Sequence, residues 1–482
     1  MMERLGRATL AASMAAVAAA CAGAPPAAPV VAAPAGAPVT APSGPLAITC
    51  DDDAARVGTR PESLAPWTEA ARGDVVRCQR VEHLDAATLA ARLAAKGYDG
   101  APPKTGVTIV RIGYRARRDD AAKKPDAITG AFVLFPDAPR ATDVAVLDAH
   151  GTIGLAAACA PTRSPTHPLN LALAGAGFVT VATEYQGFSY DEPPQAWMSG
   201  EDEARALFDS ARALTKLTTE AYHPKKVLLI GHSEGGHTVL AAQALARADG
   251  FPIPIAGVIS SAPMWFGGRL FADMIGAGDG SNHDAGSRDL VWSLFYFYGH
   301  GATFSGQAEA VAAFAPARRD ELAKLLSTKC ALDLDAPLGK ARAADVYDPA
   351  FVGALKACLG GGACTAEATR WVSWMKRDAP VVDPAGAPVL LWAGGADVNV
   401  TPTRARCAAE DLARTLPKGR LAVCVDPKAT HKGAHEGLLE RDVDRMIGWL
   451  SARAFGDPEP ACDGIDALDA LGKLTCPRAA MR

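Results

Sequence analysis

A serine between glycines is the residue best suited to covalent chemistry in this chain of 482 residues. Residues 231–235 read Gly-His-Ser-Glu-Gly, follow the apolar run 227–230, and precede a helix-like stretch that starts at Gly236. A strand, a G-x-S-x-G turn and a helix together hold a serine on a strained turn with its hydroxyl exposed. The alternative is an ordinary serine in a Gly-rich connection. We therefore predict that Ser233 is a nucleophile.

Asp397 is the predicted acid of a catalytic triad. A serine nucleophile needs a histidine that takes its proton and a carboxylate that orients the histidine. In sheets of this type the three follow in the order serine, acid, histidine. Asp397 comes just after the apolar run 389–392, where catalytic groups collect beyond the carboxyl end of a strand. The alternative role is a turn-capping aspartate.

Two histidines compete for the role of general base. His431 and His435 both lie between the predicted strand 421–425 and the predicted closing helix 438–454. His435 is preferred because it directly precedes that helix, where the base is expected to sit. His431, which has the shorter loop from the strand, is the alternative. The other histidine is then a loop residue.

An oxyanion hole requires two backbone N–H groups near the developing negative charge. One is expected from Glu234, the residue after the nucleophile, and the other from the loop after an earlier strand. Residues 148–152 supply that loop, with Thr152 as the preferred donor and Gly151 as the second choice. The alternative is a plain glycine turn.

Short apolar runs alternate with amphipathic stretches, and this alternation positions the candidate residues. Predicted strands occupy residues 107–114, 128–135, 144–148, 178–183, 227–230, 255–260, 389–392 and 421–425, and predicted helices occupy 168–174, 201–217, 236–246 and 438–454. Such alternation predicts an α/β fold with a mostly parallel, twisted sheet and helices on both faces. Right-handed crossovers follow from the same geometry.

One segment interrupts the alternation. Residues 263–380 contain no clear strand, and an insertion of this size between two sheet strands predicts a helical cap over the active site. The cap carries an aromatic run, namely Trp292, Phe295, Tyr296, Phe297 and Tyr298. We expect this run to form the core of the cap, and the alternative is the lining of an acyl pocket.

The N-terminus has the features of an export signal. Residues 1–20 combine Arg4 and Arg7 with an apolar, Ala-rich run and are followed by Cys21, as in a lipoprotein signal peptide. Lipidation of Cys21 would anchor the protein in the cell envelope, at the outer membrane of a Gram-negative cell, and simple secretion is the alternative. Residues 21–49 are predicted to be an Ala/Pro-rich disordered tether, and residues 50–482 the catalytic domain.

Cysteine usage also favours export. Ten of the eleven cysteines remain after Cys21, an even number that indicates disulfides. The predicted local pairs are Cys50–Cys78, Cys407–Cys424 and Cys462–Cys476. There is no C-x-x-C pair and no tight His/Cys cluster, so no metal site is predicted. The formal net charge of −4 gives no indication of a nucleic-acid partner.

Taken together, these motifs resemble the secretory lipase family and its bacterial relatives. The matching pieces are His150-Gly151-Thr152, Cys159-Ala160-Pro161-Thr162, Glu184-Tyr185-Gln186-Gly187, residues 231–236, the turn ending at Asp397, and the tail from His435 to Trp449. The resemblance covers about residues 107–455. It implies an α/β-hydrolase fold with a helical cap, no cofactor, and extracellular hydrolysis of carboxylic esters, from short acyl esters to triglycerides.

Two departures from the family pattern affect the site. Glu234 stands where the family usually has glutamine, and its carboxylate could repel an anionic transition state. Residues 431–434 are extra, which obscures the correspondence of the histidine. The predicted function is a serine esterase or lipase that acts on a small-molecule or lipid ester. The alternatives are a serine peptidase and a non-catalytic surface protein on the same fold.

Overall fold

A computed structural model gives the structure of the chain. It describes residues 45–98, 100–120, 122, 124–189, 192–265, 269–277, 289–338, 341–431 and 437–471. The signal peptide, Cys21 and most of the predicted tether lie outside these residues. Residues 45–47 already belong to the fold of the catalytic body: the Ala47 N–H donates to the Leu217 carbonyl (2.9 Å), and the Thr219 N–H donates to the Pro45 carbonyl (2.8 Å). The body therefore includes residues before the predicted boundary at residue 50.

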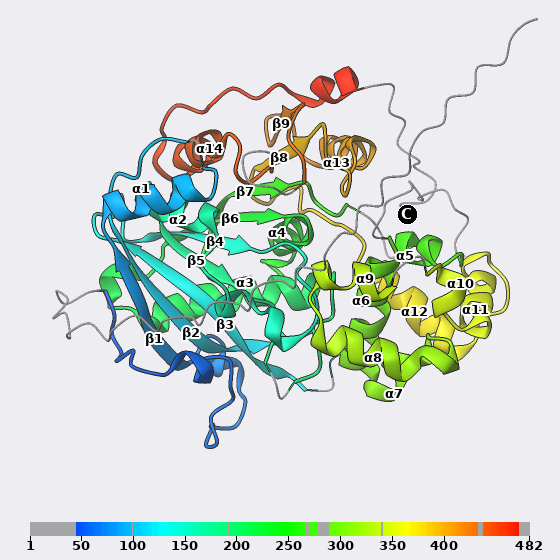
Figure 1. Cartoon of the computed structure of the whole chain (residues 1–482). Helices are drawn as coiled ribbons and strands as arrows, with labels where there is room; N and C mark the ends of the chain where they lie inside the picture. Colours follow the sequence, from blue (N-terminus) through cyan, green and yellow to red (C-terminus); the bar gives the residue numbers. More distant parts are fainter. Residues whose placement is uncertain are drawn as a thin grey trace, which may run out of the picture. The chain divides into compact units, whose positions relative to one another are not determined.

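The described residues form a nine-stranded sheet (Figure 1). The strands are β1 (Val75–Leu84), β2 (Val107–Arg117), β3 (Asp126–Pro136), β4 (Val144–Ala149), β5 (Val179–Thr183), β6 (Lys226–His232), β7 (Ile255–Ser261), β8 (Val389–Gly394) and β9 (Leu421–Asp426). Their order is β1-β2-β3-β5-β4-β6-β7-β8-β9. From β5 through β4, β6, β7 and β8 to β9, neighbouring strands pair in parallel. Strand β2 pairs antiparallel with β1 and β3, and β3 also pairs antiparallel with β5. The eight predicted strands are confirmed.

Helices cover both faces of the sheet, as predicted. One face packs against α1 (Ala86–Ala95), α2 (Pro168–Gly175) and α14 (Val443–Phe455), and the other against α3 (Gly200–Leu217), α4 (Glu234–Leu245) and α13 (Pro402–Thr415). Alternate residues of the central strands enter the two cores. Ile230 lies in the first core and Leu229 in the second, so β6 is buried on both sides.

Two features of this framework differ from the prediction. Strand β1 lies at the edge of the sheet and is only partly buried, so its sequence keeps arginine, glutamine and glutamate and lacks an apolar run. The closing helix begins at Val443 and not at residue 438, because Asp442 adopts a left-handed conformation with a φ of 52°. The segment before α14 is therefore a turn and not helix.

The region between β7 and β8 is helical and is called the cap below. It contains α5 (Arg269–Met274), α6 (Asp289–His300), α7 (Gln307–Ala312), α8 (Arg319–Thr328), α9 (Asp335–Leu338), α10 (Ala343–Val346), α11 (Pro349–Leu359) and α12 (Ala366–Arg377), which lie together in Figure 1. The aromatic run on α6 is buried and forms its core. The Phe297 ring contacts those of Tyr347, Phe351 and Trp371.

Four disulfides join described cysteines: Cys50–Cys78, Cys159–Cys330, Cys358–Cys364 and Cys424–Cys462. The first predicted pair is confirmed. The pairs Cys407–Cys424 and Cys462–Cys476 are wrong, because the C-terminal tail runs along β9, where the Gly464 N–H donates to the Val423 carbonyl (2.8 Å). This brings Cys462 to Cys424. Cys407 is also disulfide-bonded.

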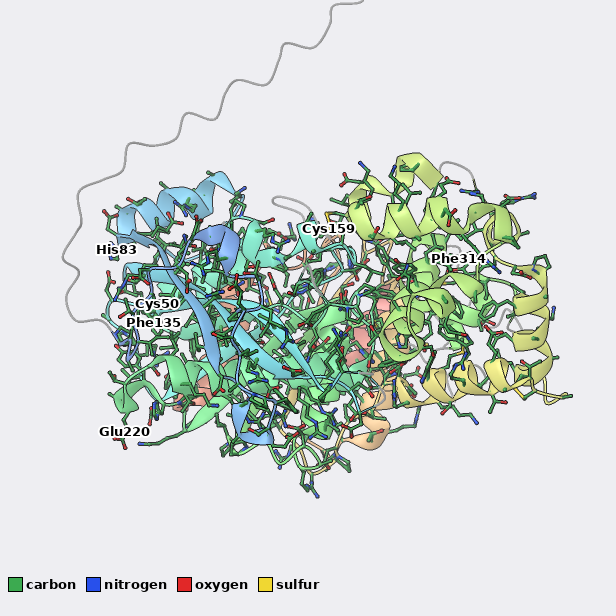
Figure 2. The ribbon with its side chains drawn as sticks, turned by 90° about the horizontal axis from the view of Figure 1, so that it is seen from below. Cys50, His83, Phe135, Cys159, Glu220 and Phe314 are labelled. Atoms are coloured by element: carbon green, nitrogen blue, oxygen red, sulfur yellow. A yellow bond between two sulfur atoms is a disulfide. The ribbon has the colours of Figure 1, made fainter. Side chains whose placement is uncertain are left out.

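The Cys159–Cys330 disulfide connects the segment after β4 to the cap (Figure 2). Beside it, the Ala331 N–H donates to the Ile153 carbonyl (2.8 Å). The cap is thus fastened next to residues 150–153. Within the described part of the chain, no helix combines the length and apolarity that a bilayer span requires.

Candidate active site

The predicted nucleophile lies on a sharp turn between β6 and α4. Ser233 has a φ of 59° and a ψ of −116°, a conformation that residues other than glycine seldom adopt. Its N–H donates to the Ser261 carbonyl (2.9 Å), and its own carbonyl accepts from the Met264 N–H (3.1 Å). The neighbouring strand β7 and the loop after it therefore hold the turn in place.

The glycines of the motif make this turn possible. A Cβ on Gly235 would lie 1.9 Å from the Ala149 carbonyl oxygen, and one on Gly231 would lie 2.2 Å from the Gly235 carbonyl oxygen. Both distances are far below van der Waals contact, so no larger residue fits without displacing the backbone. The sequence pattern thus reflects the close approach of the turn to the end of β4.

His431 and Asp397 meet in a buried hydrogen bond. The distance from His431 Nδ1 to Asp397 Oδ2 is 2.8 Å, and the two side chains are 5 % and 0 % exposed. The other oxygen, Oδ1, accepts from the N–H groups of Asn399 (2.8 Å) and Val400 (2.9 Å). The turn after β8 therefore orients the carboxylate, and the carboxylate orients the imidazole so that Nε2 is left for proton transfer.

The imidazole of His431 also lies close to the serine turn. Its ring centroid is 4.4 Å from that of His232, the residue before Ser233. His435, which the sequence favoured as the base, belongs to residues 432–436 and lies outside the described residues. That preference stays a prediction. Ser233, Asp397 and His431 follow in the expected order and come from turns at the carboxyl ends of β6, β8 and β9.

The loop after β4 passes directly beside the predicted nucleophile. A Cβ on Gly151 would lie 3.1 Å from the His232 carbonyl oxygen and 3.5 Å from the Ser233 Cβ. The Tyr185 hydroxyl donates to the His150 carbonyl (2.8 Å), and the two rings are in contact at 4.3 Å. Tyr185 therefore fixes this loop against the turn, next to Glu234, which is the first residue of α4.

The Glu234 carboxyl lies in a buried pocket of donors. The side chain is 1 % exposed, and it accepts hydrogen bonds from Gln195 Nε2, Trp197 Nε1 (2.7 Å) and the Thr152 hydroxyl. Burial raises the pKa of Glu234 to about 7, and these donors oppose the shift. Hydrogen bonds from these three donors therefore compensate for the burial of the Glu234 carboxyl.

A cavity of about 350 Å³ adjoins the histidine. His431, His232 and the loop at His150 line it, together with Asp148 and Asn170. Burial raises the pKa of Asp148 to about 7, and a hydrogen bond from the Asn170 side chain opposes the shift. The cavity can therefore hold a substrate group beside His431, with a carboxyl and an amide available to bind it.

The two histidines that flank Ser233 have other partners. His232 Nδ1 lies 3.2 Å from the Ser261 hydroxyl. His237 is buried and interacts with the backbone of Asp378, and burial lowers its pKa to about 4. A group that stays neutral and faces the cap is poorly placed as the base for Ser233.

Several site residues were not found from the sequence. They are Tyr185, Gln195, Trp197 and Glu203, which surround Glu234 and the loop after β4, and Asn170 in the cavity. Glu203 lies in the first turn of α3, where acidic residues are ordinary, so nothing in the pattern marks it as buried. Tyr185 belongs to a piece that carries the family resemblance, and this was the one available signal.

No protein-family model matches the sequence, and no curated protein does. Solved structures do match. A structure from Legionella pneumophila aligns with a TM-score of 0.62 and 17 % identity over 79 % of this chain and 99 % of its own. The rice cell wall degrading esterase LipA from Xanthomonas oryzae gives 0.59 and 16 % over 80 % and 98 %, and Candida antarctica lipase A in its closed state gives 0.57 and 16 % over 85 % and 89 %.

These likenesses establish the architecture, since the identities are low but the alignments span most of each chain. The turn between β6 and α4 and the chain order of Ser233, Asp397 and His431 match the strand, turn and helix pattern of this fold. This chain therefore has the α/β-hydrolase fold that the sequence resemblance implied.

Proposed function

We propose that this protein is an exported serine hydrolase that cleaves carboxylic esters. The observation that carries the proposal is the buried His431–Asp397 pair beside a serine with a positive φ. A histidine whose Nδ1 is held by a carboxylate presents Nε2 to an adjacent nucleophile, and this is the arrangement that activates a serine hydroxyl.

The proposed reaction has two stages. The Ser233 oxygen attacks the acyl carbon while His431 Nε2 takes its proton, and Asp397 stabilises the resulting imidazolium. The N–H groups of Thr152 and Glu234 bind the oxyanion of the tetrahedral intermediate. His431 then donates the proton to the alcohol oxygen as the ester bond breaks and leaves an acyl-enzyme. Water, deprotonated by His431, releases the acid and restores Ser233.

The solved structures with this fold favour ester substrates over amides. The Xanthomonas oryzae protein is named as an esterase and the Candida antarctica protein as a lipase. We carry this substrate class over to the present chain, for a small-molecule or lipid ester. The described disulfides favour an oxidising compartment, and the sequence of residues 1–21 favours export with a lipid anchor on Cys21.

A panel of nitrophenyl esters and peptide anilides tests the proposal. Wild-type protein is expected to hydrolyse the esters with a much higher kcat/KM than the anilides, and Ser233→Ala is expected to abolish turnover. Better turnover of the anilides would make the protein a peptidase. Failure of folded wild-type protein to turn over either class would favour a non-catalytic role.

A further inference from the structure

Two buried carboxyl groups face each other behind the proposed nucleophile. Glu203 on α3 and Glu234 on α4 are 0 % and 1 % exposed and are hydrogen-bonded to each other. Gln195 Nε2 donates to both, at 3.1 Å to Glu203 Oε1. Glu203 also accepts from the Met198 N–H (2.7 Å) and the Thr238 hydroxyl (2.6 Å). The pair is therefore a built, fully enclosed polar group.

One of the two acids must hold a proton for such a pair to be stable in the interior. Two adjacent carboxylates out of reach of water cannot both ionise at neutral pH. Burial and the negative charge of Glu234 raise the pKa of Glu203 well above its usual range, whereas the hydrogen bonds from Gln195, Thr152 and Trp197 oppose the rise in the pKa of Glu234. Glu203 is therefore the proton donor of the pair, and Glu234 the acceptor.

The same carboxylate reaches the loop after β4. Glu234 accepts a hydrogen bond from the Thr152 hydroxyl, and Trp197 Nε1 lies 2.7 Å from Glu234 Oε2 and 3.1 Å from Thr152 Oγ1. The backbone N–H groups of Thr152 and Glu234 are the two proposed oxyanion donors. The side chains of the two donor residues, Thr152 and Glu234, are thus hydrogen-bonded to each other.

We propose that the Glu234 side chain, held by Glu203, is a positioning residue that fixes the Thr152 amide at its distance from the Glu234 amide. This inference rests on the proposed ester hydrolysis. The carboxylate acts through Thr152 and Trp197 and does not touch the substrate. Because the oxyanion forms only during reaction, loss of this link weakens transition-state binding more than substrate binding.

Glutamine is the matched control at residue 234. Its amide oxygen can accept from Thr152 and Trp197, and its amide nitrogen can donate to an ionised Glu203. Leucine has a similar volume but offers no acceptor. We expect Glu234→Leu to lower kcat on a nitrophenyl ester by about 10- to 100-fold, below the ~100- to 1,000-fold loss of a whole oxyanion donor. Its KM is expected to change less than about twofold, and Glu234→Gln to stay within about threefold of wild type.

The hydrogen bond between Thr152 and Glu234 can also be removed by substitution of Thr152. Thr152→Val keeps the backbone N–H and removes only the hydroxyl, and Thr152→Ser restores the hydroxyl. We expect about a tenfold loss of kcat for valine, with recovery for serine. The Thr152→Val/Glu234→Leu double variant is expected to lose no more than Glu234→Leu alone, since both changes break one interaction.

The outcomes separate this inference from the proposed function. The positioning role would be overturned if Glu234→Leu and Thr152→Val both kept the wild-type kcat, or if their losses multiplied in the double variant. An inactive Ser233→Ala variant would still uphold ester hydrolysis in that case. Full activity of Ser233→Ala would instead overturn the proposed function. If circular dichroism shows that Glu234→Leu does not fold, the Thr152→Val and Thr152→Ser pair decides.

Discussion

The described residues include two buried His–Asp pairs with the same separation. His431 and Asp397 lie 2.8 Å apart beside the serine turn, and His300 and Asp378 lie 2.8 Å apart where the cap meets α4. All four side chains are nearly or fully buried. Distance and burial alone therefore do not distinguish the proposed catalytic pair from a structural one.

The pairs differ in which ring nitrogen of the histidine is bound by the aspartate and in what lies around the other nitrogen. His300 Nε2 is hydrogen-bonded to Asp378, and His300 Nδ1 lies 3.1 Å from the Tyr296 carbonyl, so both ring nitrogens have partners. Asp378 also accepts from the Tyr296 hydroxyl (3.1 Å). At His431 the aspartate takes Nδ1, and the ring lines a cavity next to His232. Chemistry requires a ring nitrogen that can reach both a nucleophile and a substrate.

Removal of each imidazole is expected to give the largest contrast. His431→Ala should lower kcat by about four to six orders of magnitude, because Ser233 loses its base. His300→Ala should keep kcat within about tenfold and lower the free energy of unfolding by ~2–4 kcal/mol, because Asp378 loses a buried partner. Ester kinetics and urea denaturation measure the two effects.

His435→Ala is the control for this pair of variants. We expect it to be mild if His431 is the base. A loss of several orders of magnitude in His435→Ala, with a mild His431→Ala, would instead uphold the base preferred from the sequence and contradict the role given to the His431–Asp397 contact.

The two aspartates provide the next comparison. Asp397→Asn should reduce kcat by about 10⁴-fold, because an amide cannot stabilise the imidazolium and favours the wrong tautomer. Asp378→Asn should leave kcat nearly unchanged and lower the melting temperature. Steady-state kinetics and thermal unfolding of both variants measure this, and equal losses of kcat would show that the cap pair also takes part in catalysis.

Removal of the Cys159–Cys330 disulfide gives a third comparison between the serine site and the cap. The Cys159→Ser/Cys330→Ser variant should lose about 2–5 kcal/mol of stability. Its kcat at low temperature should fall less than that of Asp397→Asn, because Cys159 lines the cavity next to His431 but supplies no group of the proposed triad. Chemical denaturation and ester kinetics at 15 °C, a temperature of about the stability maximum, test this. An inactive but folded variant would show that the disulfide also shapes the site.

The smallest effect concerns the cavity next to His431. Burial raises the pKa of Asp148 to about 7, above its unfolded value, so the folded state binds this proton more tightly than the unfolded chain does. The stability that this proton contributes is complete at acid pH and is lost as the pH rises toward and through 7. Between pH 5 and pH 8, Asp148→Asn should lose less stability than wild type in urea titrations. An equal or greater loss would contradict a buried, protonated Asp148.

The sequence predicted the parts of the fold that are buried on both sides. Strands β4 and β6 lie in the centre of the sheet, so each contains a run of apolar residues, 144–147 and 227–230, that is visible without a structure. The edge strand β1 was missed because one face meets solvent. The disulfides of the C-terminal region were mispaired because their partners are set by the path of the tail along β9 and not by separation along the chain.

The residues of the candidate site were also predictable from the sequence only in part. Ser233 and Asp397 could be named because the chemistry of each is tied to a short local pattern, a turn after a strand. Glu203, Gln195 and Trp197 could not, because they act through burial against residues from other elements, and burial of a polar side chain leaves no mark in a linear pattern. The resemblance drew attention to Glu234, and the effect of its charge on an anionic transition state stays a prediction.

Labelling with a fluorophosphonate probe tests the central claim most directly, because the probe reacts only with an activated serine. Wild-type protein and His300→Ala should both be labelled on the peptide that contains Ser233, identified by mass spectrometry. Ser233→Ala should not be labelled, and His431→Ala should react far more slowly than wild type. Labelling of His431→Ala at the wild-type rate, or no labelling of folded wild-type protein, would contradict the assignment of Ser233 and His431 as nucleophile and base.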